Sequence, residues 1–345
     1  MARAKHLTRC QPVIDNPVKL PYTLTPSGLP DGAFPAGWTG STWTISSGKG
    51  VCSPTLGAEL LPDPGLEATY TDGVCNSLTK SHAGVTCTES ADVHGGSKAQ
   101  TFLSDAANYY IYKYLVPTAN TWYLYSGWAK RTDGANSKVY LSAYQAGSGP
   151  KTSAVSNPYT SAAYAQYSLL KRTYDTSNFI YYAALQKNTG YDTVIVDDLS
   201  IKAITQASML ALRKAKANAT VKAQYTWDGN GSCGVMARAN AASNPNTFLL
   251  AIYTRFDTYV YCCLEKCVAG TWTTLIATYT NSPGSGGGGI PTNTQWLEIR
   301  CSGNTIQLFQ NNIQVGTDQT VTDVPGLYAG VFSCGGPQLE GFFVG

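Results

Sequence analysis

Three histidines and one pair of adjacent acids are the residues of this chain whose types best suit catalysis. His6 lies near the N-terminus, His82 lies in a segment rich in Gly, Ser and Thr, and His94 precedes an expected strand. None of them stands in a recognisable arrangement with a nucleophilic Ser or Cys. Asp197 and Asp198 are expected in a strand, where neighbouring side chains point to opposite faces and cannot converge on one glycosidic bond. We therefore predict that the protein is not an enzyme.

The ten cysteines could form disulfides or bind a metal. Cys75 and Cys87 flank a short polar segment and are the favoured pair for a local disulfide, although connectivity does not follow from sequence. Cys262, Cys263 and Cys267 suggest a zinc site, but Cys262 and Cys263 fall inside an alternating strand and no second pair has the right spacing. Buried or disulfide-bonded cysteine is the favoured interpretation.

The composition indicates that strands must position these residues. Charged residues make up 13% of the chain, against about 25% in an average soluble protein, and Gly and Tyr are abundant at 34 and 23 residues. Aromatic and β-branched residues suit the pleat of a sheet, while Gly and Asn suit tight turns. The net charge of +3 and the lack of a basic run predict no nucleic-acid partner. No apolar stretch approaches the 18 residues of a membrane span.

The strand pattern falls into two sets, as expected for 345 residues because one core rarely exceeds about 250. Between residues 92 and 204, short alternating stretches such as YYIYKYLV, TWYLYSGWAKR and KVYLSAYQ are each bounded by turn residues. A second set, including TFLLAIYT, YVYCCLEKC and LYAGVFS, follows residue 205. The intervening SMLALRKAKANATVKA could form a helix, but alternation from Val221 to Trp227 favours two short strands. We predict an all-β protein of two antiparallel sandwiches.

The first set carries a resemblance to a known family. Its carriers are ELLPDPGLE (Glu59–Glu67), VHGGSKAQ (Val93–Gln100), WYLYSGWAKR (Trp122–Arg131) and VIVDDLSI (Val194–Ile201). In this order and spacing, residues 58–204 resemble the jelly-roll carbohydrate-binding modules of the family four, nine and twenty-two type. The usual Asn-Gly-Gly-Phe-Glu opening is replaced here by Asp-Pro-Gly-Leu-Glu.

The second set resembles a concanavalin-like, laminin-G-type sandwich. The resemblance rests on Gly234–Asn240, Trp296–Ile299, the hairpin from Ser302 to Asn312, and Pro325–Gly330. The Trp-rich strand that usually opens such a domain is missing after residue 206. It is found upstream as Gly37-Trp38-Thr39 and Trp43-Thr44-Ile45, followed by Gly48-Lys49.

The displaced opening strand predicts a discontinuous domain. We expect residues 28–56 and 205–345 to form the concanavalin-like sandwich, with the jelly roll of residues 58–204 inserted at an exposed turn. Residues 1–27, which contain four prolines and no apolar period, are expected to form an extended arm. The alternative is two consecutive domains preceded by a long leader.

The resemblance to carbohydrate-binding modules implies a structural calcium ion. In such modules the ion often ties the opening loop to the last strand. Glu67 and Asp198 match the positions that supply carboxylates, with carbonyls contributed near Gly96 and Lys98. Calcium takes six to eight oxygen ligands and can bridge distant segments. The alternative is that these acids cap the amides of a loop.

Aromatic residues of the first set are the candidates for carbohydrate binding. Trp128, Tyr140, Tyr144 and Tyr182 lie in the middle of expected strands, where one face of a sheet could present their rings to a sugar. The alternative is that they are core and ordinary sheet-surface residues, since Tyr is a common strand former.

The expected function combines these features. The modules are of an extracellular type, yet the N-terminus has no apolar h-region of a secretory signal. A virion protein resolves this conflict because it is made in the cytoplasm and released by lysis, and the mosaic is similar to bacteriophage surface proteins. We expect a capsid decoration, head fibre or tail adhesin at the virion surface, homo-oligomeric, docked on other virion proteins through its arm and able to contact glycans. The alternative is a secreted bacterial carbohydrate-binding protein or cell-surface adhesin.

Overall fold

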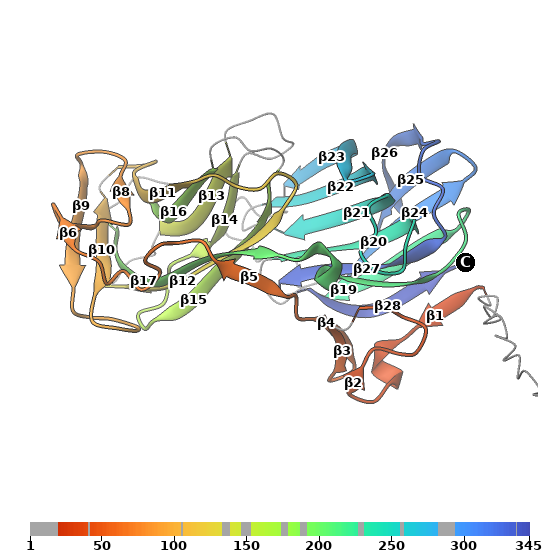
Figure 1. Cartoon of the computed structure of the whole chain (residues 1–345), viewed down its shortest axis with the longest axis horizontal. Coiled ribbons are helices and arrows are strands. Elements are labelled where there is room, and N and C mark those ends of the chain that lie inside the picture. Colours follow the sequence, from red (N-terminus) through yellow and green to blue (C-terminus); the bar gives the residue numbers. More distant parts are fainter. Residues whose placement is uncertain are drawn as a thin grey trace, which may run out of the picture.

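The computed structural model shows an elongated all-β molecule in which two sandwiches follow one another along the long axis (Figure 1). It describes residues 20–40, 42–104, 106–132, 139–145, 153–173, 179–186, 192–226, 231–255, 259–281, 294–335 and 337–345. Every pairing between described strands is antiparallel, which confirms the predicted fold class. Within these ranges there is no helix long and apolar enough to cross a membrane.

The first sandwich consists of two sheets and a small hairpin. The β12 sheet contains, in spatial order, β15 (Ala165–Arg172), β12 (Trp122–Arg131), β17 (Asp192–Ile204), β10 (Ala99–Ser104) and β9 (Val85–Ser90), with β5 (Leu56–Glu59) also on β17. The β13 sheet contains β14 (Ser153–Pro158), β13 (Val139–Gln145), β16 (Phe179–Gln186), β11 (Tyr110–Leu115) and β8 (Thr79–Lys80). The hairpin pairs β6 (Tyr70–Thr71) with β7 (Val74–Cys75).

The second sandwich has two larger sheets. The β19 sheet runs β2 (Gly32–Ala33), β3 (Trp43–Ser46), β4 (Lys49–Cys52), β28 (Gln338–Val344), β19 (Thr220–Thr226), β24 (Gln295–Ser302), β25 (Thr305–Gln310) and β26 (Ile313–Thr320), with β1 (Tyr22–Leu24) also on β28. The β20 sheet runs β18 (Leu210–Lys214), β27 (Tyr328–Gly335), β20 (Gly231–Ala239), β21 (Phe248–Arg255), β22 (Tyr259–Val268) and β23 (Thr271–Asn281). Two 3-10 turns, η1 (Pro26–Gly28) and η2 (Gln206–Met209), complete the described elements.

Strands from both ends of the chain share the β19 sheet. Tyr22 pairs with Val344, and Gly50 pairs with Leu339. The chain crosses to the first sandwich at β5 and returns at the end of β17, where the backbone N–H of Thr205 donates to the carbonyl of Thr55 at 3.2 Å. The first sandwich therefore leaves and re-enters the chain at adjacent points. Residues 1–19 of the expected arm lie outside the described residues, whereas residues 22–24 form β1.

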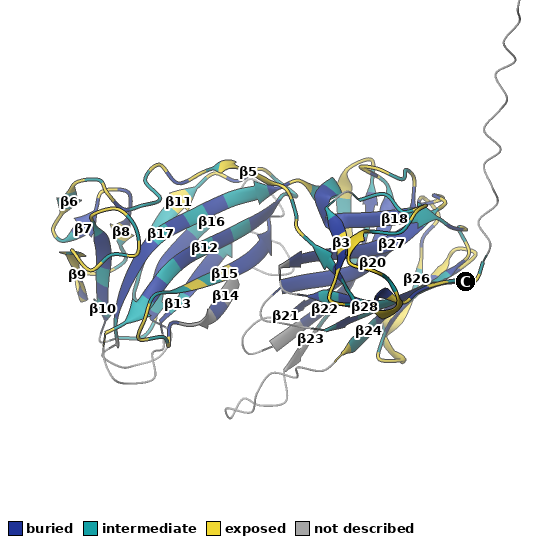
Figure 2. Ribbon diagram, turned by 90° about the horizontal axis from the view of Figure 1, so that it is seen from below, coloured by how far each residue is buried: buried dark blue, intermediate teal, exposed yellow. Residues whose placement is uncertain are grey.

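The β20 sheet is buried on both faces. One face, with Val235, Leu249 and Leu264, belongs to the core shared with the β19 sheet. The opposite face belongs to a core that continues into the first sandwich and includes Leu250 and Phe332. β20 accordingly has no residue that is even partly exposed, whereas burial alternates along β12 (Figure 2).

An ion pair links the two sandwiches within this shared core. The guanidinium of Arg172 in β15 donates two hydrogen bonds, each 2.6 Å long, to the carboxylate of Glu265 in β22. The two side chains are only 3% and 1% exposed. Arg172 also stacks over the ring of Trp272 at 4.1 Å, and Trp122 packs on Phe332 with centroids 5.4 Å apart. The sandwiches therefore share a desolvated interface rather than a solvated linker.

The cysteines correct one sequence expectation. The predicted local disulfide between Cys75 and Cys87 is wrong, because both residues are buried free thiols and the Cys75 thiol donates to Asp63 Oδ2 at 3.2 Å. Cys262, Cys263 and Cys267 are likewise buried free thiols. Burial raises the pKa of Cys262 to about 12, as expected for a thiol in apolar surroundings. These cysteines act as small core residues.

Candidate functional site

The outer side of the β13 sheet carries a concentration of tyrosines. Alternation along β11 directs Ile111 into the core and leaves Tyr110, Tyr112 and Tyr114 outside it. In β13, the core receives Val139, Leu141 and Ala143, so the residues between them face outwards. We call this outward side the tyrosine face, and it consists of Tyr110, Tyr112, Tyr114, Tyr140, Ser142, Tyr144, Ile180, Tyr182 and Leu185.

Strand register arranges the tyrosine face in three rows across β11, β16 and β13. Opposite residues of antiparallel neighbours lie on the same face. The rows are Tyr114–Ile180–Tyr144, Tyr112–Tyr182–Ser142 and Tyr110–Leu185–Tyr140. A bulge in β16 keeps this alignment, because Ala183 and Ala184 both contact the core and leave Tyr182 and Leu185 outside. Three strands distant in sequence thereby form one aromatic surface.

The rings of the tyrosine face support one another. Tyr110 packs edge-on against Tyr182 with centroids 4.5 Å apart, and Tyr112 packs edge-on against Tyr110 at 5.4 Å and Tyr114 at 4.9 Å. Such edge-to-face pairs are worth about 0.5–1.5 kcal/mol beyond the area they bury. Tyr182 is 9% exposed and Tyr114 is 55% exposed, so the surface has a covered floor and an open end. The rings are therefore held in place before any ligand arrives.

The tyrosine face is electrically neutral. Burial raises the pKa of Tyr182 above its ordinary value, and the neighbouring phenols of Tyr110 and Tyr144 raise it further. Burial also raises the pKa of Tyr112, as does a hydrogen bond with Tyr114. Tyr112 and Tyr182 therefore keep their protons at neutral pH, and the nine residues include no Asp, Glu, Lys, Arg or His. The face offers apolar ring surface with hydroxyl groups that can donate or accept hydrogen bonds.

Of the four aromatic residues predicted from sequence, three lie on this face and one does not. Tyr140, Tyr144 and Tyr182 are on the β13 sheet, whereas Trp128 is on the β12 sheet. The Trp128 ring stacks on His94 with centroids 3.8 Å apart and planes 12° from parallel. One side of the indole is thus already covered. Trp128 therefore forms a separate surface.

The predicted metal-binding acids meet at the turn that contains Gly95 and Gly96. Glu67 Oε1 accepts hydrogen bonds from the backbone N–H groups of Ser97 at 2.7 Å and Lys98 at 3.2 Å. A Cβ atom on Gly96 would lie 1.9 Å from Glu67 Oε1, and one on Gly95 would lie 2.6 Å from Asp198 Oδ2. Gly96 also has a φ of 64°, a left-handed conformation that favours glycine. For Glu67 the structure thus shows the amide capping that was the alternative to calcium binding, whereas Asp198 contacts the ring of His94.

The donor set also fits a hard cation in its chemistry. Carboxylate oxygens of Glu67 and Asp198 come from the opening loop and the last strand, and backbone carbonyls of the turn could complete the oxygen ligands that calcium prefers. Among the described residues no group of three or more His, Cys, Asp or Glu side chains could hold a metal by itself. A calcium ion would therefore depend on backbone oxygens.

Asp197 and Asp198 correct a second expectation. Both contact His94, since Asp197 Oδ2 accepts its backbone N–H at 2.7 Å and Asp198 Oδ2 lies 2.6 Å from its Nδ1. The predicted opposite orientation is wrong here because Asp198 has a φ of 44° and the register with β12 shifts at this point. Asp197 is buried and also accepts the backbone N–H of Gly95 and of Asp198. Both oxygens of the Asp197 carboxylate therefore accept backbone amides.

The sequence analysis missed Tyr110, Tyr112 and Tyr114. The signal was present as YIYKY, in which every second residue is tyrosine. Period-two spacing places all three rings on one face of a strand. What the sequence could not show is that this face adjoins Tyr182, because β11 and β16 are far apart in the chain.

Comparison with known proteins adds distant structural likenesses. No family model matches the chain, and no curated protein matches it. The tandem CBM22-1–CBM22-2 domain of Paenibacillus barcinonensis Xyn10C is similar over 85% of this chain and 98% of its own, at 9% identity and a TM-score of 0.36. The CBM22-1 xylan-binding domain of the same enzyme is similar over 41% of this chain and 92% of its own, at 13% identity and 0.34.

A second kind of structure is also similar. The Caenorhabditis elegans galectin LEC-6 matches over 39% of this chain and 89% of its own, with 14% identity and a TM-score of 0.29. The class that this chain's own topology defines is an all-β protein of two antiparallel sandwiches joined by a buried interface.

Proposed function

We propose that this protein binds an uncharged polysaccharide chain on the tyrosine face and catalyses no reaction. The observation that carries the proposal is the gathering of six tyrosines from three neighbouring strands on one uncharged sheet surface. Sugars present apolar C–H faces and equatorial hydroxyls, which suit aromatic rings and phenol oxygens respectively. The neutrality of the face favours neutral glycans over uronic acids or sulfated sugars, which would need cationic partners.

The geometry also supports an extended ligand rather than a single sugar. Tyr110, Tyr112 and Tyr114 recur along β11 at every second residue, which is a spacing of roughly 6.6–6.8 Å. Tyr140 and Tyr144 extend the surface across β13. A chain of several sugars can contact such a row at once, and each contact adds to the affinity. The fixed rings lower the entropy lost on binding.

We also propose a structural calcium ion at Glu67 and Asp198. The ion would connect the opening loop to β17 and leave the tyrosine face on the other sheet unaffected. When bound, it would supply positive charge to two carboxylates that approach the same turn. The protein's own residues would hold the turn in shape through the hydrogen bonds of Glu67 to Ser97 and Lys98.

Affinity electrophoresis tests the glycan proposal. Native gels that contain xylan, mixed-linkage β-glucan or hydroxyethyl cellulose should retard the protein, and a gel with polygalacturonate should not. Tyr114→Ala should lose about fivefold in affinity for the retarding polymer, because an exposed ring contributes on the order of 1 kcal/mol. Trp128→Ala is the matched control on the other sheet and should retain most of the affinity. No retardation by any neutral polymer would contradict the proposal.

A location at the virion surface is a second proposal, supported by the cysteines. Eight cysteines among the described residues (Cys52, Cys75, Cys87, Cys233, Cys262, Cys263, Cys267 and Cys301) are free thiols, although ten cysteines in an exported chain would ordinarily form disulfides. This pattern suits folding in a reducing cytoplasm followed by release through lysis, and it is less suited to the secreted adhesin. Docking through the N-terminal arm and homo-oligomerisation belong to the same proposal. Electron microscopy of the native particle would show whether the chain decorates a capsid or tail.

A further inference from the structure

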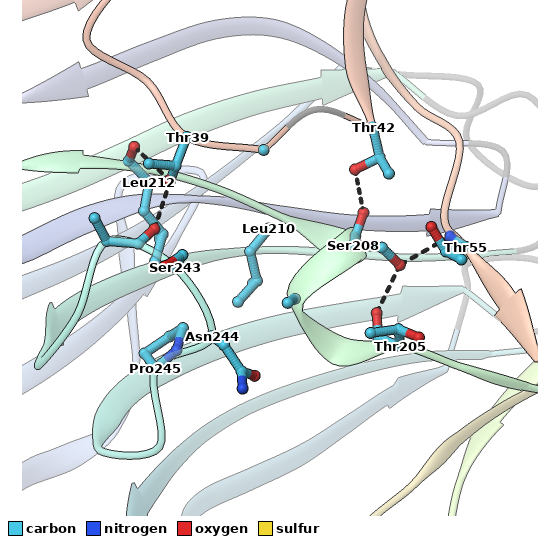
Figure 3. A pocket seen from close by; sticks show the side chains of 13 residues that line it. Thr39, Thr42, Thr55, Thr205, Ser208, Leu210, Leu212, Ser243, Asn244 and Pro245 are labelled. Atoms are coloured by element: carbon cyan, nitrogen blue, oxygen red, sulfur yellow. Dashed lines mark hydrogen bonds between the residues drawn. The ribbon is translucent and has the colours of Figure 1, made fainter.

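A pocket of about 280 Å³ lies where the chain passes between the two sandwiches (Figure 3). It is lined by Thr55 and by three further parts of the chain that are distant in sequence. These are the segment around Thr39 and Thr42, the return from the first sandwich between Thr205 and Leu212, and the loop from Ala242 to Pro245. It shares no residue with the tyrosine face, so the inference below stands without the glycan proposal.

The pocket has an apolar floor and hydroxyl-bearing walls. Leu210 and Leu212 are buried and contribute aliphatic surface. The single hydroxyl hydrogen of Thr39 is shared between the carbonyls of Leu212 and Ala242, and the Thr42 hydroxyl donates to the carbonyl of Ser208. These hydroxyl hydrogens are already engaged. The hydroxyl oxygens can therefore act towards the pocket mainly as hydrogen-bond acceptors.

The inner wall contains a third fixed hydroxyl. Ser208 Oγ donates to the carbonyl of Thr205 at 2.6 Å and accepts the backbone N–H of Thr55 at 2.9 Å. Gly40 completes this wall in a left-handed conformation with a φ of 111°, and a Cβ there would lie 2.4 Å from the carbonyl oxygen of Leu210. Only glycine allows the two segments to approach this closely. The wall is thus a fixed arrangement of backbone and short hydroxyl side chains.

The rim is polar and open. The side chains of Thr55, Thr205, Ser243 and Asn244 line the entrance and are exposed to solvent. They can reorient to donate or accept hydrogen bonds. No residue that lines the pocket carries a charge, so neither an anion nor a cation would be compensated there.

We propose that this pocket binds one small neutral polyol of the size of a single pyranose. The volume lies just under the range of about 300–1,000 Å³ of sites for drug-sized ligands. A pyranose places an apolar C–H face on Leu210 and Leu212 and donates its hydroxyl hydrogens to the acceptor oxygens of Thr39 and Thr42. Its remaining hydroxyls meet the rim. The pocket therefore matches the amphipathic character of a sugar ring better than that of a purely apolar or an ionic molecule.

Saturation-transfer difference NMR on the full chain tests this inference. The probes are methyl α- and β-D-glucopyranoside, methyl β-D-galactopyranoside, methyl β-D-xylopyranoside and glycerol, each at millimolar concentration. At least one pyranoside should receive saturation, and Ser243→Trp, which places an indole in the entrance from an exposed position, should weaken its binding at least tenfold. Ser302→Trp is the matched control and should leave the signal unchanged, because Ser302 is an exposed serine that lines neither the pocket nor the tyrosine face. Tyr114→Ala tests the other site.

A milder variant covers the case in which the bulky substitution disturbs folding. Thr205→Val removes one rim hydroxyl, is isosteric, and keeps the backbone carbonyl that Ser208 uses. It should weaken binding about three- to tenfold. Absence of saturation for every probe would overturn the inference, and so would a signal that is equal in the wild type and in folded Ser243→Trp. Loss of the signal in Tyr114→Ala instead would assign monosaccharide binding to the tyrosine face.

Discussion

The tyrosine face and the outer face of the β20 sheet show how similar strands acquire different roles. Both are outward faces of antiparallel sheets rich in aromatic and aliphatic residues. Among the described strands, no sheet packs over the tyrosine face, and its strands alternate between core residues and tyrosines. The outer face of the β20 sheet is covered by the first sandwich, and Leu250 and Phe332 lie in a core that both sandwiches share. What packs over a face decides whether it can serve as a binding surface.

Removing the first sandwich should have the largest effect on this comparison. We propose the discontinuous domain of residues 28–56 and 205–345, and Thr55 and Thr205 are close enough to be joined directly. A chain that lacks residues 57–204 should retain a β-rich circular dichroism spectrum but expose the outer face of the β20 sheet. It should therefore bind a hydrophobic dye strongly, unlike the full chain. A spectrum of an unfolded chain would contradict the proposed domain boundaries.

The buried ion pair offers the next largest effect. Arg172→Ala should lower the free energy of unfolding by about 3–5 kcal/mol, because it leaves Glu265 buried without its guanidinium partner. Lys266→Ala is the control, since Lys266 forms a partly exposed ion pair with Asp323 at 2.7 Å. An ion pair of this kind contributes about 0–1 kcal/mol to the free energy of unfolding. Denaturant unfolding measures both. Equal losses in the two variants would show that the interface is solvated.

Lys171, the neighbour of Arg172, makes stability depend on pH in a defined direction. Burial lowers its pKa from 10.5 to about 7, and the charge of Arg172 adds to this shift. Between about pH 7 and 10.5, Lys171 is therefore protonated in the unfolded chain but not in the folded chain. The free energy of unfolding that is lost by burying this ammonium group is largest below pH 7 and becomes smaller as the pH rises. Lys171→Met should stabilise the protein at pH 6 by a few kcal/mol.

The control for this prediction is how the stability difference between Lys171→Met and the wild type depends on pH. The advantage of Lys171→Met over the wild type should shrink steadily from pH 7 towards pH 10. Taking the difference between the two proteins cancels the opposite trend of the buried cysteines, whose raised pKa values make the folded state lose stability at alkaline pH. An advantage that is independent of pH would contradict the assignment.

Calcium should give a smaller effect, confined to the first sandwich. Calcium at a hundredfold excess over its dissociation constant should raise the Tm by roughly 5 °C relative to a chelator. Glu67→Gln should abolish this increase while leaving the protein folded. Glu89→Gln is the control, because Glu89 is an exposed acid of β9 that pairs with Lys98 instead. No increase in the wild type would leave amide capping as the sole role of Glu67.

The sequence predicted the features of the fold that follow from the alternation of residues along a strand and from turn residues. The all-β class, the two sets of strands and the strands from Leu210 and Thr220 all followed from local patterns. The alternation of tyrosines in β11 was equally local. Which strands pair with one another is not determined by local sequence, however. Trp128 and Tyr144 both lie in alternating, aromatic-rich segments of the sequence, although the two segments belong to different sheets. Sheet order therefore had to come from the structure.

Two further errors have equally physical origins. Asp197 and Asp198 were expected on opposite faces, but a left-handed φ at Asp198 breaks the alternation that the rule assumes. Cys75 and Cys87 were expected to form a disulfide from their spacing, but each has its own place in the apolar core of the first sandwich. Backbone irregularities and core packing at single residues leave little trace in a sequence.

The most direct test of the account is to map where a neutral oligosaccharide binds. Full-length protein labelled with ¹⁵N would be titrated with xylohexaose and cellohexaose, and with an oligogalacturonide as the charged counterpart. We predict that at least one neutral hexasaccharide perturbs amide signals concentrated in β11, β13 and β16, and that the oligogalacturonide perturbs none. Perturbations centred on Trp128 and β12, or no perturbation by any neutral sugar, would contradict the assignment of the tyrosine face as the binding surface.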